Sequence, residues 1–336
     1  MRILIATDAW FPQVNGVVRT LSTTAGILGD LGHEVEVVAP QRFRTIPCPT
    51  YPEIRLALGA GHGVPRAIRA FDPGAIHIAT EGPIGLAARR WCVRQGHPFT
   101  TSYHTRFPEY LRLRAPVPLA WSYRFMGWFH GRAARTMVAT RSMEQELEAW
   151  GFRHLVRWTR GVDISLFRPR ESPVLDLPRP LFMYVGRVAV EKNIEAFLAL
   201  DLPGTKVVVG DGPALAELRR RHPDTHFTGY KMGEELAAHV GSADVMVFPS
   251  LTDTFGLVLL EAMASGVPVA AFPVPGPRDL VRDGVNGCVG EDLRAAALAA
   301  LEVDRDACRG FAEGYSWEAS TRQFLANLAP RVTAAV

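Results

Sequence analysis

Short apolar runs alternate with longer amphipathic stretches along the whole chain. The runs are continuous rather than alternating, as parallel strands covered on both faces require. In the first half we expect strands at residues 3–6, 35–39, 75–78, 99–102 and 136–139, and helices at residues 17–31, 83–95, 118–134 and 142–150. This order of elements predicts a doubly wound α/β domain resembling the Rossmann fold.

The same rhythm restarts after residues 168–180, where four of thirteen positions are proline. Proline continues neither a helix nor a central strand, so this segment is the best candidate for a linker. Further strands are expected at residues 181–185, 206–209, 226–228, 245–248 and 267–271. We therefore predict two Rossmann-like domains facing a cleft, residues 1–170 and 171–315, followed by a terminal segment at 316–336.

Composition is that of an ordinary globular protein, with 48% apolar and 21% charged residues. No apolar run reaches the roughly 18 residues that a membrane span needs. The sequence opens directly on a strand, and its four cysteines include no C-x-x-C pair. We therefore expect a cytoplasmic protein without a signal peptide, a disulfide framework or a metal site.

Charge is distributed unevenly along the chain. The first 170 residues carry 22 arginines, no lysine and 12 acidic residues, a net charge of +10, whereas the remainder has a net charge of −7. A basic first half favours an anionic partner for that half, the alternative being a chance distribution.

Candidate chemistry lies in the loops that follow strands. The first loop lacks the G-x-G-x-x-G fingerprint of dinucleotide-binding proteins, but ends in Asn15 and Gly16 before a helix. Gly16 would let backbone N–H groups approach an anion, although a plain turn explains it equally well. In the second half, Arg187 and Lys192 share a strand-to-helix loop. A guanidinium fork and a point charge suit a diphosphate, the alternative being two solvated surface cations.

The most informative segment follows the strand at 245–248. Asp253 precedes a helix that is expected to start near Phe255. The helix dipole stabilises a carboxylate at that end, so Asp253 could also be a plain N-cap. Glu261 lies inside an otherwise apolar helix, so it needs a partner, either in the cleft or in an internal salt bridge. The N–H groups of residues 254–257 would point into the same cleft.

Together these segments resemble family four of the retaining glycosyltransferases, which have the two-domain GT-B architecture. The signature of that family is Glu-x7-Glu, and here the pattern runs from Asp253 to Glu261. The resemblance implies that Glu261 holds the ribose hydroxyls of a nucleotide and that Asp253, shorter by one methylene, faces the donor sugar. It places backbone N–H groups around Phe255, Gly256 and Leu257 at the sugar and phosphates.

The resemblance assigns further residues. Gly16 lets the first loop approach the diphosphate, and Arg187 and Lys192 match the phosphate-binding pair. His104 matches a histidine that contacts the donor sugar, and Tyr230 lies in the loop beside the base. Residues 1–170 would then be the acceptor domain, 171–315 the nucleotide-sugar donor domain, and 316–336 a helix crossing back to the first. The implied reaction is retaining transfer from a UDP- or GDP-linked hexose, without metal or cofactor, in which the leaving diphosphate helps to deprotonate the acceptor.

Three short runs indicate the kind of acceptor. Residues 11–17, 81–87 and 103–105 resemble bacterial glycolipid-forming members, namely mannosyltransferases and the sulfoquinovosyl- and glucuronosyl-diacylglycerol synthases. Residues 106–135 also interleave arginines with aromatic residues, as a helix on an anionic membrane does. The candidates for this surface are Arg112, Arg114, Trp121, Arg124 and Trp128. We expect a lipid acceptor and a peripheral position on the inner face of the cell membrane, the alternative being a core helix with a solvated arginine face.

Other functions remain open at this point. The acceptor could be a soluble oligosaccharide. A nucleotide-sugar epimerase can share the two-domain fold, and a non-catalytic nucleotide-binding protein would need only the donor site. Nucleic acid is disfavoured, because the basic excess is arginine alone, is spread through the domain and contains no recognised binding motif.

Overall fold

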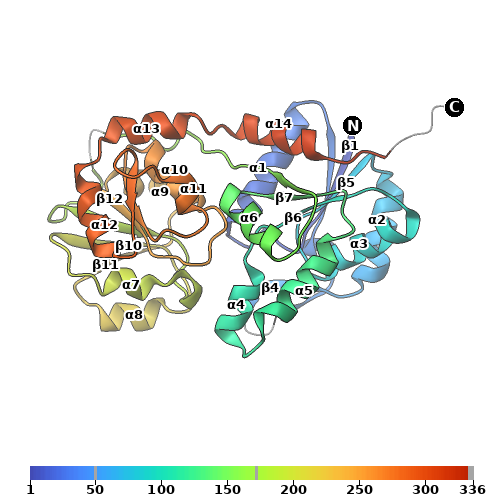
Figure 1. Ribbon diagram of the computed structural model, residues 1–336, viewed down its shortest axis with the longest axis horizontal. Helices are drawn as coiled ribbons and strands as arrows, with labels where there is room; N and C mark the ends of the chain where they lie inside the picture. The colour runs from blue at the N-terminus through green and yellow to red at the C-terminus, as the bar shows by residue number, and fades with distance from the viewer. Residues whose placement is uncertain (49–50, 171–172, 332–336) are drawn as a thin grey trace. The chain divides into compact units, whose positions relative to one another are not determined.

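The computed structural model describes residues 1–48, 51–170 and 173–331. The chain forms two compact units, whose elements are labelled in Figure 1. Unit 1 combines Met1–Thr159 with Trp317–Val336, and unit 2 is Arg160–Ser316. Each unit contains a six-stranded parallel sheet with helices packed on it, so the predicted fold class is confirmed.

The sheet of unit 1 has the strand order β2-β1-β5-β6-β7-β8, and every pairing in it is parallel. Its strands are β1 (Arg2–Ala6), β2 (Glu34–Val38), β5 (Ala75–Ile78), β6 (Thr100–Ser102), β7 (Arg135–Val138) and β8 (Leu155–Arg157). The chain builds outward from β1 in one direction and from β5 in the other. The switch point of this sheet therefore lies between β1 and β5, where such folds bind ligands.

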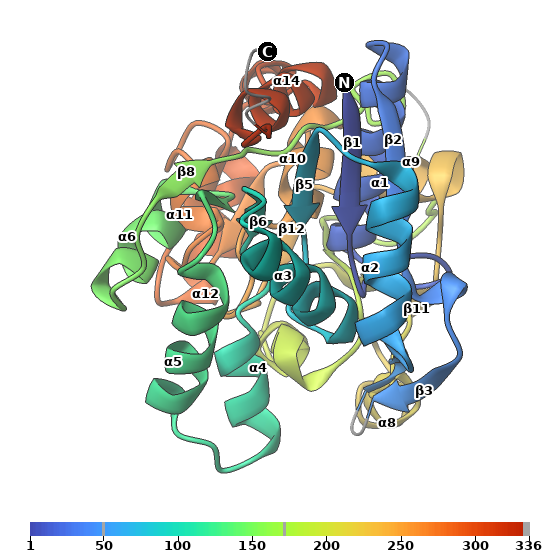
Figure 2. The same cartoon turned by 90° about the vertical axis from the view of Figure 1, so that its right-hand side faces the viewer.

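Helices cover both faces of this sheet. They are α1 (Gly16–Asp30), α2 (Ala60–Phe71), α3 (Pro83–Gln95), α4 (Phe107–Arg114), α5 (Leu119–His130), α6 (Arg141–Ala149) and α14 (Trp317–Asn327). Helices α2 and α3 lie on one face (Figure 2). There Val64 of α2 and Ile84 of α3 pack with Leu4 of β1 in a buried cluster. Leu21 of α1 and Phe324 of α14 belong to the cluster on the other face.

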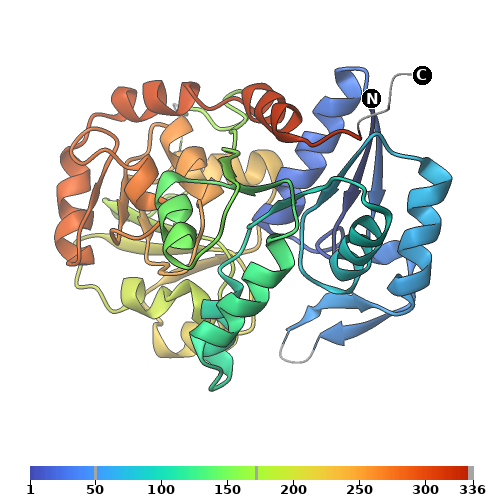
Figure 3. The ribbon, with the colours of Figure 1, turned by 45° about the vertical axis from the view of Figure 1, so that its right-hand side comes forward.

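The final helix, α14, is an integral part of unit 1. The Phe324 ring lies 4.7 Å from that of Trp158 and 4.9 Å from that of His77, measured between centroids. Gln323 accepts a hydrogen bond of 2.7 Å from the Thr159 backbone N–H. Within unit 1, α4 and α5 lie at the opposite end from α14 (Figure 3).

Some elements of unit 1 were not predicted. An antiparallel hairpin, β3 (Thr45–Cys48) and β4 (Tyr51–Ala57), precedes α2, and a short 3₁₀ helix, η1 (Pro40–Arg42), precedes the hairpin. Helix α2 was missed because Pro65 lies inside it. The helix predicted at 118–134 is α5, which ends at His130, whereas α4 was not predicted. A proline-containing turn separates the two helices, and Pro118 is the N-cap of α5.

Unit 2 repeats the architecture with the strand order β11-β10-β9-β12-β13-β14. Its strands are β9 (Leu181–Val185), β10 (Thr205–Val209), β11 (His226–Gly229), β12 (Val245–Phe248), β13 (Val269–Ala271) and β14 (Gly287–Val289). Its helices are η2 (Val190–Lys192), α7 (Ile194–Leu198), α8 (Leu215–Arg221), α9 (Gly233–Gly241), α10 (Leu257–Ala264), α11 (Pro277–Leu280), α12 (Leu293–Ala299), η3 (Ala300–Glu302) and α13 (Arg305–Glu313). The switch point lies between β9 and β12.

The boundary between the units differs from the prediction at residue 170. Residues before that point already pack in unit 2, since the Val162 N–H donates to the Tyr315 carbonyl at 3.0 Å and Arg309 donates to the Phe167 carbonyl at 2.9 Å. The proline-rich segment at 168–180, of which 171–172 lie outside the described residues, is therefore part of unit 2 rather than a linker. Prolines exclude regular structure there, but the neighbouring polar groups still find partners.

The described part of the chain contains no helix that is both long enough and apolar enough to cross a bilayer. All four cysteines lie among the described residues, and none of them forms a disulfide.

Candidate active site

The candidate site of unit 2 lies where β9 and β12 end, at the switch point of its sheet. The loop after β9 contains residues 186–193, and the loop after β12 contains residues 249–256. Two hydrogen bonds join these loops. Thr252 Oγ1 donates to the Glu191 carbonyl at 2.9 Å, and Asn193 Nδ2 donates to the Pro249 carbonyl at 3.0 Å. The two loops therefore form one polar surface at the carboxyl ends of the strands.

An ion pair lies at the centre of this surface. Lys192 Nζ lies 2.6 Å from Asp253 Oδ1, and the two side chains are only 20% and 18% exposed. The structure thus brings these two candidate site residues together. Asp253 Oδ2 is buried and has no hydrogen-bond partner in the described structure, and the same is true of Ser250 Oγ in the same loop. Unsatisfied buried acceptors are uncommon in folded proteins and are accounted for when a ligand supplies the donor.

Arg187 lies in the same loop and faces a carboxylate that sequence reasoning missed. Its Nε is 4.0 Å from Glu191 Oε1, and the Glu191 side chain is 2% exposed. The Tyr184 hydroxyl donates to the Arg187 carbonyl at 2.7 Å, which fixes the start of the loop. Each predicted cation therefore has a carboxylate neighbour, so the loop is not a site of unbalanced positive charge. The sequence signal that could have identified Glu191 is its place between two cations of the same loop.

Close backbone packing explains the glycines at this edge. A Cβ on Gly210, which follows β10, would lie 1.9 Å from the Gly186 carbonyl oxygen. Gly256 has a φ of 83°, in the left-handed region. These two positions therefore require glycine, and they bring the neighbouring loops together.

Asp253 is not the N-cap of α10, which was the alternative role considered for it. Helix α10 begins at Leu257 rather than near Phe255, and its N-cap is Gly256, which has no side chain to cap it. The left-handed turn at Gly256 separates Asp253 from the helix, so its carboxylate is directed to Lys192 instead. Phe255 is buried, and its carbonyl packs closely against Gly276.

Glu261 is buried as predicted, with 5% of its surface exposed, in a helix whose neighbouring residues are also buried. It has an interaction partner within the structure and is not an isolated charge. Tyr230 follows the edge strand β11, and 46% of its surface is exposed. This residue, which was predicted to lie beside the base, is thus partly exposed at the edge of the sheet.

The candidates of unit 1 follow β1 and β6. Asn15 is the N-cap of α1, and its side chain accepts from the N–H groups of Val17 and Val18, so two of the amides near Gly16 are already engaged. His104 follows β6, is partly buried and packs edge-on against Trp158, with 5.6 Å between ring centroids.

Asp8, which follows β1, was not singled out by sequence reasoning. Its carboxylate is 5% exposed and accepts from the N–H groups of Ile84 and Gly85 and from Thr80 Oγ1. Burial raises the pKa of Asp8, against the lowering effect of these hydrogen bonds. Because Ile84 and Gly85 lie in the first turn of α3, Asp8 caps that helix from the loop after β1.

Helices α4 and α5 divide the predicted basic aromatic segment into two sets. The exposed side chains are Phe107, Arg112, Leu113, Trp121, Arg124, Phe125, Trp128 and Arg132. Arg106 instead pairs with Glu109 and Glu146, Tyr123 is buried, and Arg114 is partly buried and donates to the Tyr110 carbonyl. The predicted surface is thus narrower than the sequence segment. We call the exposed set the α4–α5 surface.

The face of α5 in this surface follows helical spacing. Trp121, Phe125 and Trp128 are separated by four and three residues, and are 72%, 40% and 54% exposed. The opposite face of the same helix buries Met126 and Phe129. A core helix with a solvated arginine face would not present a second apolar face to solvent. Arg89 lies over the Trp128 ring at 3.9 Å, which holds that indole in place.

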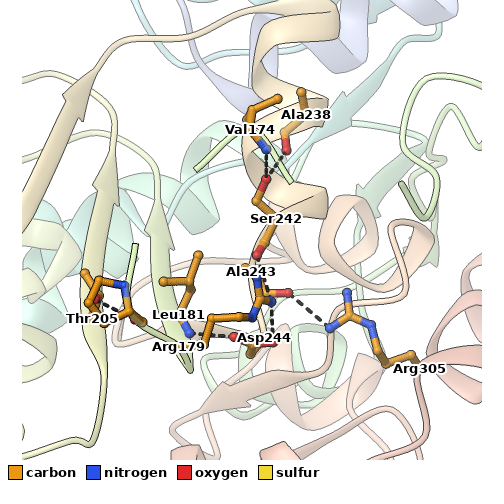
Figure 4. A network of polar contacts seen from close by, with 10 residues as sticks. Val174, Arg179, Leu181, Thr205, Ala238, Ser242, Ala243, Asp244 and Arg305 are labelled. Atoms are coloured by element: carbon orange, nitrogen blue, oxygen red, sulfur yellow. Dashed lines mark hydrogen bonds and ion pairs between the residues drawn. The ribbon is translucent and has the colours of Figure 1, made fainter. Parts of the chain in front are cut away.

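At the other end of the unit 2 sheet, where β9 and β12 begin, the polar groups bind one another. A cavity of about 340 Å³ there is lined by Arg179, Asp244 and Arg305 among others. Asp244 accepts from Arg179 at 2.5 Å and from the Leu181 N–H at 2.6 Å, and Arg305 donates to the Ala243 carbonyl (Figure 4). These polar groups satisfy one another, so this network fastens the start of the sheet. The described residues include no group of three or more His, Cys, Asp or Glu side chains placed to hold a metal ion.

Comparison with known proteins matches both units. Residues 14–166 match the family described as Glycosyltransferase Family 4, and residues 179–304 match Glycosyl transferases group 1. The GDP-mannose-dependent alpha-mannosyltransferase of Mycobacterium tuberculosis is 32% identical over 310 residues, which cover 84% of this chain and 81% of that protein. The alpha-monoglucosyldiacylglycerol synthase of Streptococcus pneumoniae is 26% identical, covering 91% of this chain and 79% of the synthase.

The fold also matches a solved structure. Sucrose-phosphate synthase from Thermosynechococcus elongatus superposes with a TM-score of 0.75 at 21% identity, covering 97% of each chain.

Proposed function

This chain belongs to glycosyltransferase family 4 and is a nucleotide-sugar glycosyltransferase, and from that premise we propose that it is a retaining enzyme that transfers a hexose to a membrane lipid without metal. The observation that carries the proposal is the buried, unsatisfied Asp253 Oδ2 beside Lys192, at the switch point of unit 2. A sugar hydroxyl would supply the missing donor.

The donor would occupy the surface formed by the two loops of unit 2. Lys192 and Arg187 would neutralise the charge that grows on the leaving diphosphate, which is where an enzyme gains most from fixed cations. Glu261 would hold the ribose hydroxyls, Tyr230 would lie beside the base, and Gly256 would bring backbone N–H groups toward the sugar and phosphates. Phe255 and Leu257 flank that glycine.

Residues of unit 1 would complete the reaction. The loop that ends at Gly16 would approach the diphosphate, and His104 would contact the donor sugar. The leaving diphosphate would help to deprotonate the acceptor hydroxyl on the same face of the sugar, which retains the anomeric configuration. Retention is measured directly by NMR of the product anomer, and an inverted product would contradict this mechanism.

Donor binding is tested by thermal shift with GDP-mannose and UDP-glucose. A donor present at 100 times its dissociation constant adds about 2.7 kcal/mol of stability. GDP-mannose is the first choice, because a relative of 32% identity is named for its dependence on it. Glu261→Ala should weaken that binding far more than it lowers the melting temperature of the free protein. No shift with any nucleotide sugar would refute the proposed donor class.

The proposed acceptor is a diacylglycerol-type lipid at an anionic membrane. A relative of 26% identity is named as an alpha-monoglucosyldiacylglycerol synthase. The α4–α5 surface supports this, because exposed indoles beside arginines suit a membrane interface. Trp121 and Trp128 would enter the headgroup region, and Arg112 and Arg124 would face its phosphates. The protein would then bind peripherally to the inner face of the cell membrane.

Liposome flotation tests the membrane step. Binding to vesicles that contain phosphatidylglycerol should weaken at high salt and in the double variant Arg112→Gln/Arg124→Gln. The matched control, Arg66→Gln/Arg69→Gln, removes the same charge from exposed positions of α2. Equal loss of binding in both variants, or no binding at low salt, would contradict a specific membrane surface. Transfer to an oligosaccharide, or epimerised donor in the absence of any acceptor, would instead identify one of the alternative activities.

A further inference from the structure

Unit 1 carries a carboxylate that the proposed donor site does not use. Glu81 lies between the end of β5 and the start of α3, at the switch point of the sheet, where parallel α/β folds bind ligands. Its side chain is 21% exposed, so it is accessible to a small polar group.

A buried chain of hydrogen bonds holds this carboxylate. His130 Nε2 lies 3.2 Å from Glu81 Oε1, and the histidine side chain is 2% exposed. The other ring nitrogen, Nδ1, lies 2.9 Å from Thr101 Oγ1, which in turn lies 3.0 Å from Thr136 Oγ1. The Tyr103 ring packs beside the imidazole. Because each group in the chain is fixed by the next, Glu81 is held in one orientation.

One oxygen of Glu81 is left for a ligand. Oε1 is engaged by His130, whereas Oε2 accepts no hydrogen bond from the residues that the structure describes. The nearby Asp8 differs from Glu81 in its hydrogen bonding, since it is buried and both of its oxygens accept hydrogen bonds within the fold. The two carboxyl groups are neighbours in the fold, because Gly82, the residue after Glu81, packs against the Asp8 carboxyl group.

This arrangement selects the charge of the ligand. The first N–H groups of α3, which would otherwise attract a phosphate, are occupied by Asp8. The accessible Glu81 carboxylate repels anions and accepts hydrogen bonds. A neutral hydroxyl group can donate to Oε2, whereas a phosphate dianion has no donor to offer.

We propose that Glu81 binds a hydroxyl of the acceptor and that the reacting end of the acceptor is an uncharged alcohol, as in a diacylglycerol, rather than a phosphorylated one. This inference rests on the proposed function. His130 is the positioning residue for Glu81 and does not itself contact the acceptor.

Steady-state transfer to dioleoylglycerol in mixed micelles tests the role of Glu81. In Glu81→Gln the KM for this acceptor should rise about tenfold, since a hydrogen bond to a charged group is lost, while the KM for the donor stays unchanged. Glu144→Gln is the matched control, because that side chain is 26% exposed on α6 and lies 3.9 Å from Arg157. Its acceptor KM should equal that of the wild type.

Two variants of His130 separate positioning from packing. In His130→Gln the amide can still donate to Glu81, so the acceptor KM should stay within about threefold of the wild type. In His130→Ala that donor is lost, and the acceptor KM should rise as in Glu81→Gln, with the donor KM unchanged. Equal acceptor KM values in the glutamine and alanine variants would remove His130 from this role.

The selectivity is tested with 1-oleoyl lysophosphatidic acid, whose free hydroxyl lies next to a phosphate monoester, as a competing acceptor. The wild type should favour dioleoylglycerol by at least about tenfold in kcat/KM. An unchanged acceptor KM in Glu81→Gln, or a preference for the phosphorylated lipid, would overturn the inference while leaving the transferase intact. Failure of the proposed function is recognised separately, because it appears as absent thermal stabilisation by any nucleotide sugar before an acceptor is added, and the inference then falls with it.

Discussion

Neutralising Asp253 should separate its role at the donor from its role in folding. Asp253→Asn keeps the size of the side chain but removes the charge that faces Lys192 at 2.6 Å and the buried acceptor Oδ2. A hydrogen bond to a charged group contributes about 1.5–3 kcal/mol. If Asp253 binds a donor hydroxyl in the transition state, kcat/KM for the donor should fall about 10- to 150-fold. The ion pair is about four-fifths buried, so removing one of its two charges should also lower stability, by about 3 kcal/mol.

The assay is steady-state transfer with the donor varied, accompanied by the melting temperature of each variant. Asp224→Asn makes the same chemical change at an exposed position of unit 2 and should leave kcat/KM unaltered. A value for Asp253→Asn within twofold of the wild type, in a folded protein, would refute the assignment. A large fall in melting temperature without a kinetic effect would make Asp253 a structural residue.

Three further variants test the fold around the sites. Phe324→Ala removes a fully buried ring that packs on Trp158, and should lower the free energy of unfolding of unit 1 by about 3–5 kcal/mol in urea titrations; a loss below 1 kcal/mol would show that α14 is dispensable. Gly210→Ala would place a Cβ 1.9 Å from a carbonyl oxygen and should cost about 1–3 kcal/mol and weaken donor binding, measured by thermal shift; unchanged values would contradict the close packing. Burial raises the pKa of Asp8 above its ordinary 3.8, so the folded state holds that proton more tightly. The stability of the wild type relative to Asp8→Asn should therefore fall as pH rises from about 4, and a constant difference would contradict the shift.

Much of the fold could be predicted because buried parallel strands produce continuous apolar runs. The strand predicted at residues 181–185 coincides with β9, and that at 75–78 coincides with β5. The hairpin of β3 and β4 could not be predicted, because it lies outside the parallel sheet and contains prolines. The boundary at residue 170 was wrong for a related reason. Proline content reports the absence of regular structure, whereas a unit boundary depends on which residues pack together.

The position of the candidate site could be predicted from the sequence, but the contacts within it could not. The order of strands places the loops after β9 and β12 side by side, so the neighbourhood of Lys192 and Asp253 followed from the fold class. The pairing of Lys192 with Asp253 depends on the left-handed backbone at Gly256. The neighbour of Arg187 is the buried Glu191, and the order of residues does not reveal that burial. On α5, however, the three- and four-residue spacing of Trp121 and Trp128 about Phe125 could have separated the exposed face from the buried one.

Unit 1 is discontinuous in sequence, and this has a consequence for how the chain is made. During synthesis all of unit 2, Arg160–Ser316, emerges before the helix that covers one face of the unit 1 sheet. Unit 2 can therefore acquire its native structure on the ribosome, while the apolar surface around Trp158 waits for the last residues to be translated. We expect the nascent chain to recruit chaperones chiefly through unit 1, and a chain shortened before Trp317 to be cleared by proteases although unit 2 is complete.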